Sequence, residues 1–498
     1  MSIAAAETEH NLGFHLHQQN CCAEAEPFYR RAIALDPELK EAWMNLGLVV
    51  LSQGRSEEAL TCQREALRLD PENADALNNL GMVHYAQGNI VEAENCFRAA
   101  LRLRSDHANA TLNLGATRQI HNRVEEAEGL FRRALVLGAD AAHANSNLAL
   151  ALLEQVRPEE AESCCRAALA LRPGYPEARA NLAMALLTTG RLEEGFQQYE
   201  ARWEVETMGK PAPVLPKPRW TGQPLNGETV LLYAEQGFGD TLQFCRYVPM
   251  VAAAGGRVVL VVPKPLRSLM TTLEGVAEVL CEDAAVLPHF DYHCPLLSLP
   301  FAFRTTMATL PGPRVYLRAD PASWSETLIG LPGLKVGVAW AGKSRTAQPH
   351  AMAIDKRRSM RLNDMAPLFS VPGCSFVSLQ LGPPAAQMQA LPEAAGLLDV
   401  SGRLTDWTDT AALIAGLDLV IAVDTAVAHL AGALGRPVWM LNRFDSCWRW
   451  FVNRDDTPWY PSMRVFRQTS RGDWAGVIQR VMQELTERAA ARGSQVVL

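Results

Sequence analysis

Two short segments carry polar residues where an expected strand passes into an expected helix. The first contains Gln236, Gly237, Gly239 and Asp240, directly before a helix that we expect to begin near Thr241. Glycines let a ligand approach the backbone, and the free N–H groups and dipole of a helix start favour an anion or a polarised oxygen. Asp240 could there accept a proton from a hydroxyl nucleophile. The structural alternative is that Asp240 only caps the helix, which is a common role of Asp.

The second segment joins the apolar run 417–423 to another expected helix. Asp424, Thr425 and Ala426 fall in its first turn, and His429 lies about one turn further along. Backbone N–H groups and a Thr hydroxyl at that place can bind a diphosphate. The alternative is again structural, with Asp424 as a cap and His429 as an ordinary helical histidine.

A third group of candidates is basic. Lys343, Arg357 and Arg358 follow the expected strand at 334–340, where cations could stabilise a departing nucleotide. A solvated basic loop is an equally good explanation. The aromatic residues around 447–450 and 459–461 could line a sugar or base site or belong to the core, and we assign them no role.

The elements that must position these residues are short strands alternating with helices. Apolar runs of strand length recur after residue 228, at 229–233, 257–262, 334–340, 375–379 and 417–423. Strand and helix in alternation predict parallel sheets, whose ligands lie at the carboxyl ends of the strands. We expect two doubly wound lobes, at 228–320 and 333–498. A proline-rich linker at 206–227 precedes them, because proline does not continue a helix.

A period of 34 residues fills the first 200 residues. The positions that keep this period are alanines at 25, 59, 93, 127 and 161, leucines at 12, 46, 80, 114, 148 and 182, and a small residue after each of those leucines. Pro37, Pro71 and Pro173 stand where the second helix of a repeat must end. Each unit is thus predicted to be helix, turn, helix, and the pattern resembles the tetratricopeptide repeat. We assign residues 6–205 to five clear copies and a degenerate sixth.

The sixth copy departs from the pattern and suggests a closing repeat. It has Gly195 in place of the alanine, followed by Tyr199, Arg202 and Trp203. Such large residues at the end of the array predict that this copy docks onto the lobes that follow.

One polar residue shares the period in all six copies. These asparagines are Asn11, Asn45, Asn79, Asn113, Asn147 and Asn181. A repeat superhelix has an extended concave surface, and a carboxamide both donates and accepts hydrogen bonds, so this ladder could hold a peptide backbone. It resembles the asparagine ladder of protein O-linked N-acetylglucosamine transferases, which holds the acceptor polypeptide. The alternative is that each asparagine bonds to a neighbouring helix.

The segments at 237–240 and 399–437 together resemble glycosyltransferase family 9, the heptosyltransferases of bacterial envelope synthesis. The resemblance implies a two-lobed GT-B fold with a nucleotide-sugar donor, Asp240 as the base, and Asp424, Thr425 and His429 at the donor diphosphate. Ala426 replaces the family's glycine, and its methyl group would change the approach of the phosphate. No Asp-x-Asp pair of metal-dependent sugar transferases stands in a suitable loop, so we expect no metal cofactor.

Composition excludes several other classes. The chain has 498 residues, of which 48% are hydrophobic and 20% charged, as in folded soluble proteins. The first 205 residues carry 19 basic and 29 acidic residues and the remainder 28 and 25, so neither part has the dense positive charge that nucleic acid requires. No apolar run approaches the roughly 18 to 20 residues of a membrane span. Eleven scattered cysteines without a CxxC pair and the lack of a secretory signal favour a reducing cytoplasm.

These observations predict an inverting, metal-independent glycosyltransferase whose acceptor is a protein held by the repeats. Two alternatives remain at this point. In one, the lobes have lost their chemistry and the protein is an interaction scaffold. In the other, the repeats dock a partner and the acceptor is a small glycan.

Overall fold

The computed structural model describes residues 2–205, 208, 211–312, 315–343, 349–390 and 396–496. By their contacts they divide into two compact units, one of residues 1–155 and 163–173 and the other of residues 156–162 and 174–498. In the described part of the chain, no helix is both long enough and apolar enough to cross a bilayer.

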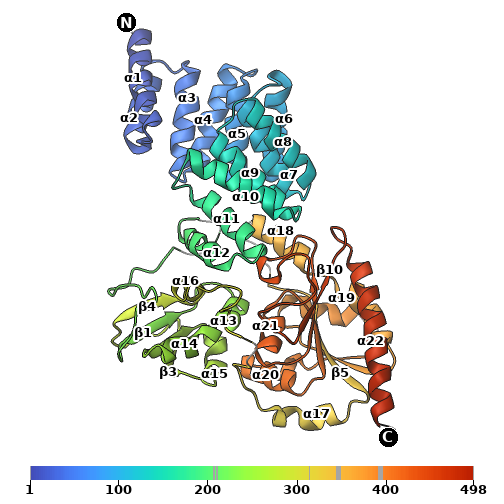
Figure 1. Ribbon diagram of the computed structural model, residues 1–498. Helices are drawn as coiled ribbons and strands as arrows, with labels where there is room; N and C mark the ends of the chain where they lie inside the picture. The colour runs from blue at the N-terminus through green and yellow to red at the C-terminus, as the bar shows by residue number, and fades with distance from the viewer. Residues whose placement is uncertain are drawn as a thin grey trace. The chain divides into compact units, whose positions relative to one another are not determined.

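The repeat region is a series of helices that follows the 34-residue period (Figure 1). The helices are α1 (Ser2–Gln18), α2 (Cys22–Leu35), α3 (Lys40–Ser52), α4 (Ser56–Leu69), α5 (Ala74–Ala86), α6 (Ile90–Leu103), α7 (Ala108–Ile120), α8 (Val124–Val136), α9 (Ala141–Glu154), α10 (Pro158–Leu171), α11 (Pro176–Thr188) and α12 (Leu192–Tyr199). The expected helix ends are confirmed, since α2 and α4 stop two residues before Pro37 and Pro71.

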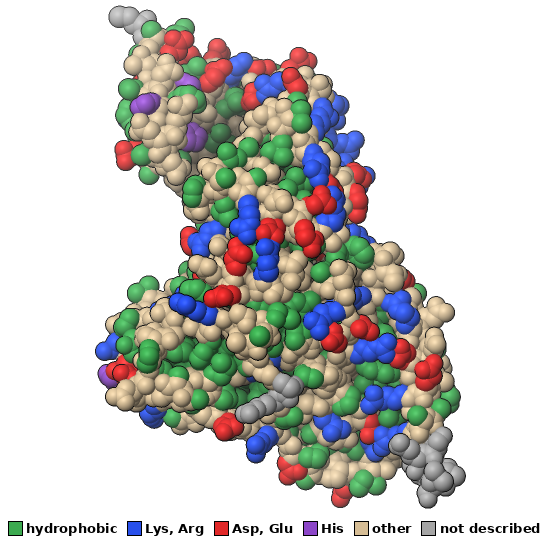
Figure 2. Space-filling view, viewed as in Figure 1, with side chains coloured by type: hydrophobic (Ala, Val, Ile, Leu, Met, Phe, Trp, Pro, Cys, Tyr) green, Lys and Arg blue, Asp and Glu red, His purple; other side chains and the backbone are tan. Residues whose placement is uncertain are grey.

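The small residue after each repeat leucine allows two helices to approach closely. A Cβ atom at Gly81 would lie 2.5 Å from the ring of Phe97, and one at Gly115 would lie 2.5 Å from the ring of Phe131. Neighbouring repeats of the first unit are also joined by ion pairs, such as Arg30 of α2 with Glu58 of α4. Figure 2 shows basic and acidic side chains interspersed over the repeats. Exposed pairs of this kind add little stability, so the apolar contacts between the helices hold the array together.

The first lobe is a four-stranded parallel sheet with the strand order β3-β2-β1-β4. Its strands are β1 (Thr229–Tyr233), β2 (Arg257–Val262), β3 (Val276–Cys281) and β4 (Tyr292–Pro295). Its helices are α13 (Phe238–Phe244), α14 (Val248–Ala253), α15 (Arg267–Met270) and α16 (Leu299–Ala302). The strand order reverses between β1 and β4, and the loop after β1 therefore opens at a topological switch point.

The second lobe is a six-stranded parallel sheet with the order β10-β9-β8-β5-β6-β7. Its strands are β5 (Leu334–Ala339), β6 (Cys374–Ser378), β7 (Leu397–Leu398), β8 (Leu419–Val423), β9 (Val438–Asn442) and β10 (Met463–Arg467). This is the order of a dinucleotide-binding sheet, with the switch point between β5 and β8. The prediction of two parallel α/β lobes is confirmed.

Helices cover both faces of the second sheet. They are α17 (Ser325–Ile329), α18 (Pro349–Arg358), α19 (Leu362–Met365), α20 (Trp407–Ala415), α21 (Ala426–Ala433) and α22 (Trp474–Val496). One core cluster packs α19 and α22 against one face, while α20 and α21 belong to the cluster on the other face (Figure 1). With both faces covered, its strands are buried and apolar, as parallel sheets require.

The sixth repeat packs as part of the second unit. Leu187 of α11 and Phe196 and Tyr199 of α12 are buried in the same core cluster as residues of both lobes. The Phe196 ring lies 5.6 Å from the ring of Trp448 and 6.3 Å from that of Phe244. The prediction that this copy docks onto the lobes is therefore confirmed.

Candidate active site

The loop after β1 leads into α13 earlier than the sequence suggested. The helix begins at Phe238 with Gly237 as its N-cap, so the expected start near Thr241 is wrong by three residues. The reason is half of a capping box: Oδ2 of Asp240 accepts a hydrogen bond from the Gly237 N–H at 3.0 Å, and glycine has no side chain to make the reciprocal bond. Asp240 thus does stabilise the helix start, from the third helical position rather than from the cap.

The other oxygen of Asp240 binds a residue to which sequence reasoning assigned no role. Nη2 of Arg449 lies 2.5 Å from Oδ1 of Asp240, and Nε of Arg449 donates to Oε1 of Gln243 at 2.7 Å. Arg449 stands in a short 3-10 helix, Trp448–Trp450, of the second lobe. Burial disfavours its charge, yet the Asp240 carboxylate raises the pKa of Arg449 above its ordinary value.

Sequence reasoning could have flagged Arg449 by its surroundings. An arginine between two tryptophans is expected to be buried, and a buried cation needs a carboxylate partner. The identity of that partner, 209 residues away along the chain, was not accessible from the local pattern.

The second motif lies at the carboxyl end of β8. Thr425 is the N-cap of α21, and its side chain makes no capping hydrogen bond. Oγ1 of Thr425 is buried and has no hydrogen-bond partner within the described residues. A buried hydroxyl without a partner is costly, and a ligand oxygen at the start of α21 would satisfy it.

His429 occupies the next turn of α21 and is fully enclosed. Its Nδ1 atom lies 3.0 Å from the Tyr460 hydroxyl, and its Nε2 atom lies 3.9 Å from Oδ1 of Asp424. Burial lowers the pKa of His429 to about 4, so the imidazole is neutral at pH 7. A proton on Nε2 would face the Asp424 carboxylate favourably, whereas a lone pair there would be repelled.

This burial makes stability depend on pH. Above pH 6.5 His429 is neutral whether the chain is folded or unfolded, but below that pH the unfolded chain takes up a proton that the folded one refuses. The folded state should therefore lose about 3 kcal/mol from this group as the pH falls from 6.5 to about 4. Urea unfolding at pH 4.5, 5.5 and 6.5 measures the slope, which His429→Gln should flatten. The exposed His289 supplies a control, His289→Gln, and equal slopes in all three proteins would contradict the prediction.

The structure brings the two motifs together. A Cβ atom at Gly239 would lie 2.9 Å from Cδ2 of His429 and 3.6 Å from Cα of Ala426. The start of α13 in the first lobe therefore packs directly on the start of α21 in the second, and only glycine allows this approach. Gly239 thus lies beside Ala426 and His429, and a shared site of the two motifs stays a prediction.

The two arginines among the basic candidates are less exposed than a solvated loop would be. Arg357 and Asp445 form an ion pair of 2.9 Å, and Arg358 and Asp355 form another of 2.9 Å. Lys343 is exposed, and its carbonyl accepts a hydrogen bond of 3.1 Å from Arg358. Both arginines therefore already neutralise a carboxylate. Their role at the donor phosphates stays a prediction.

A buried ion pair ties the sixth repeat to the loop before Asp240. Arg202 donates two hydrogen bonds to Glu235, of 2.8 and 2.9 Å, and a third of 2.6 Å to Ser298. The side chains of Arg202 and Glu235 are only 1% and 4% exposed. Gln236, the next residue, donates to the Tyr199 hydroxyl at 3.4 Å. The end of the repeat array therefore holds Glu235 and Gln236, at the beginning of the loop that leads to Asp240.

The asparagine ladder shows some of the bonding expected from its structural alternative. Asn45 bonds to His10 at 2.9 Å, and Asn113 donates to Asn78 at 2.9 Å, each contact joining the first helices of successive repeats. Asn79 is buried. Peptide binding by the ladder stays a prediction.

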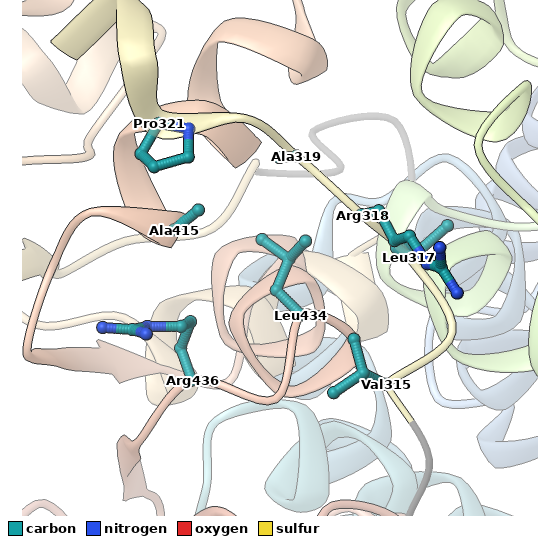
Figure 3. Close-up of a pocket in the computed structure, with 8 residues that line it drawn as sticks. All are labelled: Val315, Leu317, Arg318, Ala319, Pro321, Ala415, Leu434 and Arg436. Carbon is teal, nitrogen blue, oxygen red and sulfur yellow. The ribbon is translucent and has the colours of Figure 1, made fainter. Parts of the chain in front are cut away.

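One pocket of about 370 Å³ lies elsewhere, beside the segment that connects the two lobes. Figure 3 shows its lining, in which Arg318 and Arg436 point to opposite sides of Leu434. The remaining lining residues are Val315, Leu317, Ala319, Pro321 and Ala415. None of the candidate site residues lines this pocket, although Ala415, Leu434 and Arg436 belong to the segment 399–437.

Comparison with known families matches both parts of the chain. Models of the TPR repeat and the tetratricopeptide repeat match residues 49–88, 72–136, 112–176 and 146–211. The model of glycosyltransferase family 9 (heptosyltransferase) matches residues 377–449. The chain carries tetratricopeptide repeats followed by a glycosyltransferase family 9 domain. The family 9 match contains Asp424, Thr425 and His429 and ends at Arg449.

Individual relatives align with different shares of the chain. Protein FlbA of Caulobacter vibrioides is 30% identical over 326 residues, which are 60% of this chain and 53% of FlbA. The chain thus spans about half the length of that curated relative. Among solved structures, the Cut9–Hcn1 hetero-tetramer of APC/C aligns with a TM-score of 0.38 at 20% identity, over 39% of each chain. A thermophilic tetratricopeptide-repeat protein of Thermus thermophilus aligns with a TM-score of 0.34 at 24% identity, over 37% of this chain and 100% of that one.

Proposed function

We propose that this protein is an inverting, metal-independent glycosyltransferase that moves a sugar from a nucleotide sugar to a hydroxyl acceptor. The observation that carries the proposal is the contact between Gly239 and His429. This contact joins the start of α13, which follows β1, to the start of α21, which follows β8. Both strands lie at the switch point of their parallel sheet. Ligands of such sheets bind at these strand ends, so one ligand can reach both motifs.

Asp240 acts on the acceptor, and the other candidate residues act on the donor. The acceptor oxygen attacks the anomeric carbon while Asp240 takes its proton, and the bond from that carbon to the donor phosphate breaks. Thr425 and the free N–H groups of α21 bind the diphosphate that leaves, with Asp424 and neutral His429 beside it. Lys343, Arg357 and Arg358 offset its growing charge, which is the task a metal performs in other transferases.

The repeats bind the acceptor. Tetratricopeptide repeats are protein-interaction modules, and the ladder from Asn11 to Asn181 offers donors and acceptors to a peptide backbone. We therefore propose a protein acceptor, modified in the cytoplasm.

A thermal-shift panel of the full chain with nucleoside diphosphates and their sugars tests the donor site. At 100 times its Kd a true donor stabilises the folded state by about 2.7 kcal/mol, a rise in melting temperature of a few degrees. One nucleotide should raise the melting temperature more than the others do, both as its diphosphate and as its nucleotide sugar. The absence of any shift would favour the scaffold alternative, in which the lobes have lost their chemistry and only the repeats act.

Removing the Thr425 hydroxyl should weaken nucleotide binding. Thr425→Val keeps the volume of the side chain and leaves a ligand oxygen without its donor, at a cost of about 1–2 kcal/mol or roughly 10-fold in Kd. Calorimetric titration with the nucleoside diphosphate that gives the largest thermal shift measures this change in Kd. Thr486→Val, at an exposed site in α22, is the matched control. An unchanged Kd in Thr425→Val would remove Thr425 from the donor site.

A further inference from the structure

Arg449 is a buried cation of the second lobe that the proposed reaction does not yet use. Its side chain is 10% exposed and lies over the Trp448 ring, with its guanidinium carbon 4.3 Å from the ring centre. Each part of the guanidinium has a partner, because Nη2 binds Asp240, Nε binds Gln243 and Nη1 contacts Sγ of Cys447 at 3.2 Å. Two of these three partners belong to α13 of the first lobe.

The surroundings of Asp240 make this contact the dominant charge interaction. In the part of the chain that the structure describes, Arg449 is the only cationic group within 4.0 Å of the Asp240 carboxylate. His429 packs against the neighbouring Gly239 but is neutral at pH 7. Tyr199 also lies near Asp240 and Arg449, and burial raises the pKa of its hydroxyl.

Each oxygen of Asp240 is held by a different lobe. The Gly237 N–H fixes Oδ2 from within the first lobe, and Arg449 fixes Oδ1 from the second. A carboxylate has about four lone-pair positions, so each oxygen keeps one for an acceptor hydroxyl. The carboxylate plane is thereby set before the acceptor arrives.

We propose that Arg449 is a positioning residue that orients Asp240 for proton transfer, so that the base is complete only while the two lobes touch. This inference rests on the proposed function. Only arginine can hold Asp240 fully in this orientation, because its planar guanidinium binds Asp240 and Gln243 together. Lysine offers a single point charge.

Two substitutions at this position test the proposal. Arg449→Gln should lower kcat about 100-fold, the effect of misplacing a reacting group by about 1 Å. Arg449→Lys keeps the charge without the fork and should recover part of that loss. Turnover is followed as release of nucleoside diphosphate from the nucleotide sugar that the panel selects, and binding as the calorimetric Kd of the same diphosphate. Both variants should keep that Kd within about twofold, because Arg449 acts through Asp240.

A matched control is Arg454→Gln, which removes a partly exposed arginine paired with Asp456 at 2.6 Å in the same lobe and should leave kcat and Kd unchanged. A wild-type kcat in Arg449→Gln, or a Kd weakened as much as kcat falls, would overturn the positioning role. In the second case Arg449 would contact the diphosphate itself. If the wild type turns over no donor in the panel, the proposed function fails and this inference fails with it.

Discussion

Replacing Asp240 by Asn should abolish turnover and also destabilise the protein, and the two losses have separate causes. Loss of a general base costs about 10²- to 10⁴-fold in rate. Asparagine keeps an oxygen for the Gly237 N–H, so this hydrogen bond at the helix start survives, but the substitution leaves the buried Arg449 without its carboxylate. Breaking a fully buried ion pair costs about 3–5 kcal/mol, and the 22% exposure of the Asp240 side chain places this cost below that range.

The double variant Asp240→Asn with Arg449→Gln separates the two effects. It removes the unpaired charge, so the melting temperature should rise toward that of the wild type while turnover stays at background. Nucleotide binding should survive in both proteins. Recovery of turnover in the double variant would contradict the role of Asp240 as base and leave it a structural partner of Arg449.

The repeats and the sheet class could be predicted because their signals are local. Proline at positions 37 and 71 ends a helix wherever the chain goes, and alternating strands and helices can be recognised along the sequence. The start of α13 was missed because two positions compete for the capping role. Aspartate can stabilise a helix start either as the N-cap or from the third helical position. Here Gly237 is the N-cap and Asp240 stands at the third helical position, so the helix begins before Asp240.

The candidate site was only partly accessible for a different reason. Short motifs placed Asp240 and Asp424, but the residues that hold Asp240 and its loop come from elsewhere in the chain. Arg449 is 209 residues from Asp240, and Arg202 is 33 residues from Glu235. A single sequence indicates that a buried arginine needs a carboxylate without indicating which one.

The packing of the sixth repeat against the lobes determines which N-terminal truncations should still fold. A variant lacking residues 1–155 keeps every residue of the second unit and should fold and release nucleoside diphosphate like the full chain. A variant lacking residues 1–204 loses α11 and α12 and should not fold cooperatively. It gives up the burial of Leu187, Phe196 and Tyr199, each about 1.5–3 kcal/mol, and leaves the buried Glu235 without Arg202, a further cost of about 3–5 kcal/mol. Together these losses are comparable to the roughly 5–15 kcal/mol that keeps a domain folded.

Thermal melts and turnover of both truncated proteins check this expectation, and the shorter deletion also tests what the repeats do. If they hold a protein acceptor, removing residues 1–155 should abolish transfer to protein while hydrolysis of the donor continues, because α13 and α21 are intact. Unchanged transfer to a small glycan would instead mean that the repeats only dock a partner. Equal stability and turnover of the two truncated proteins would show that the Arg202–Glu235 pair and the α12 core contacts are dispensable, because the deletion of residues 1–204 removes them and the deletion of residues 1–155 does not.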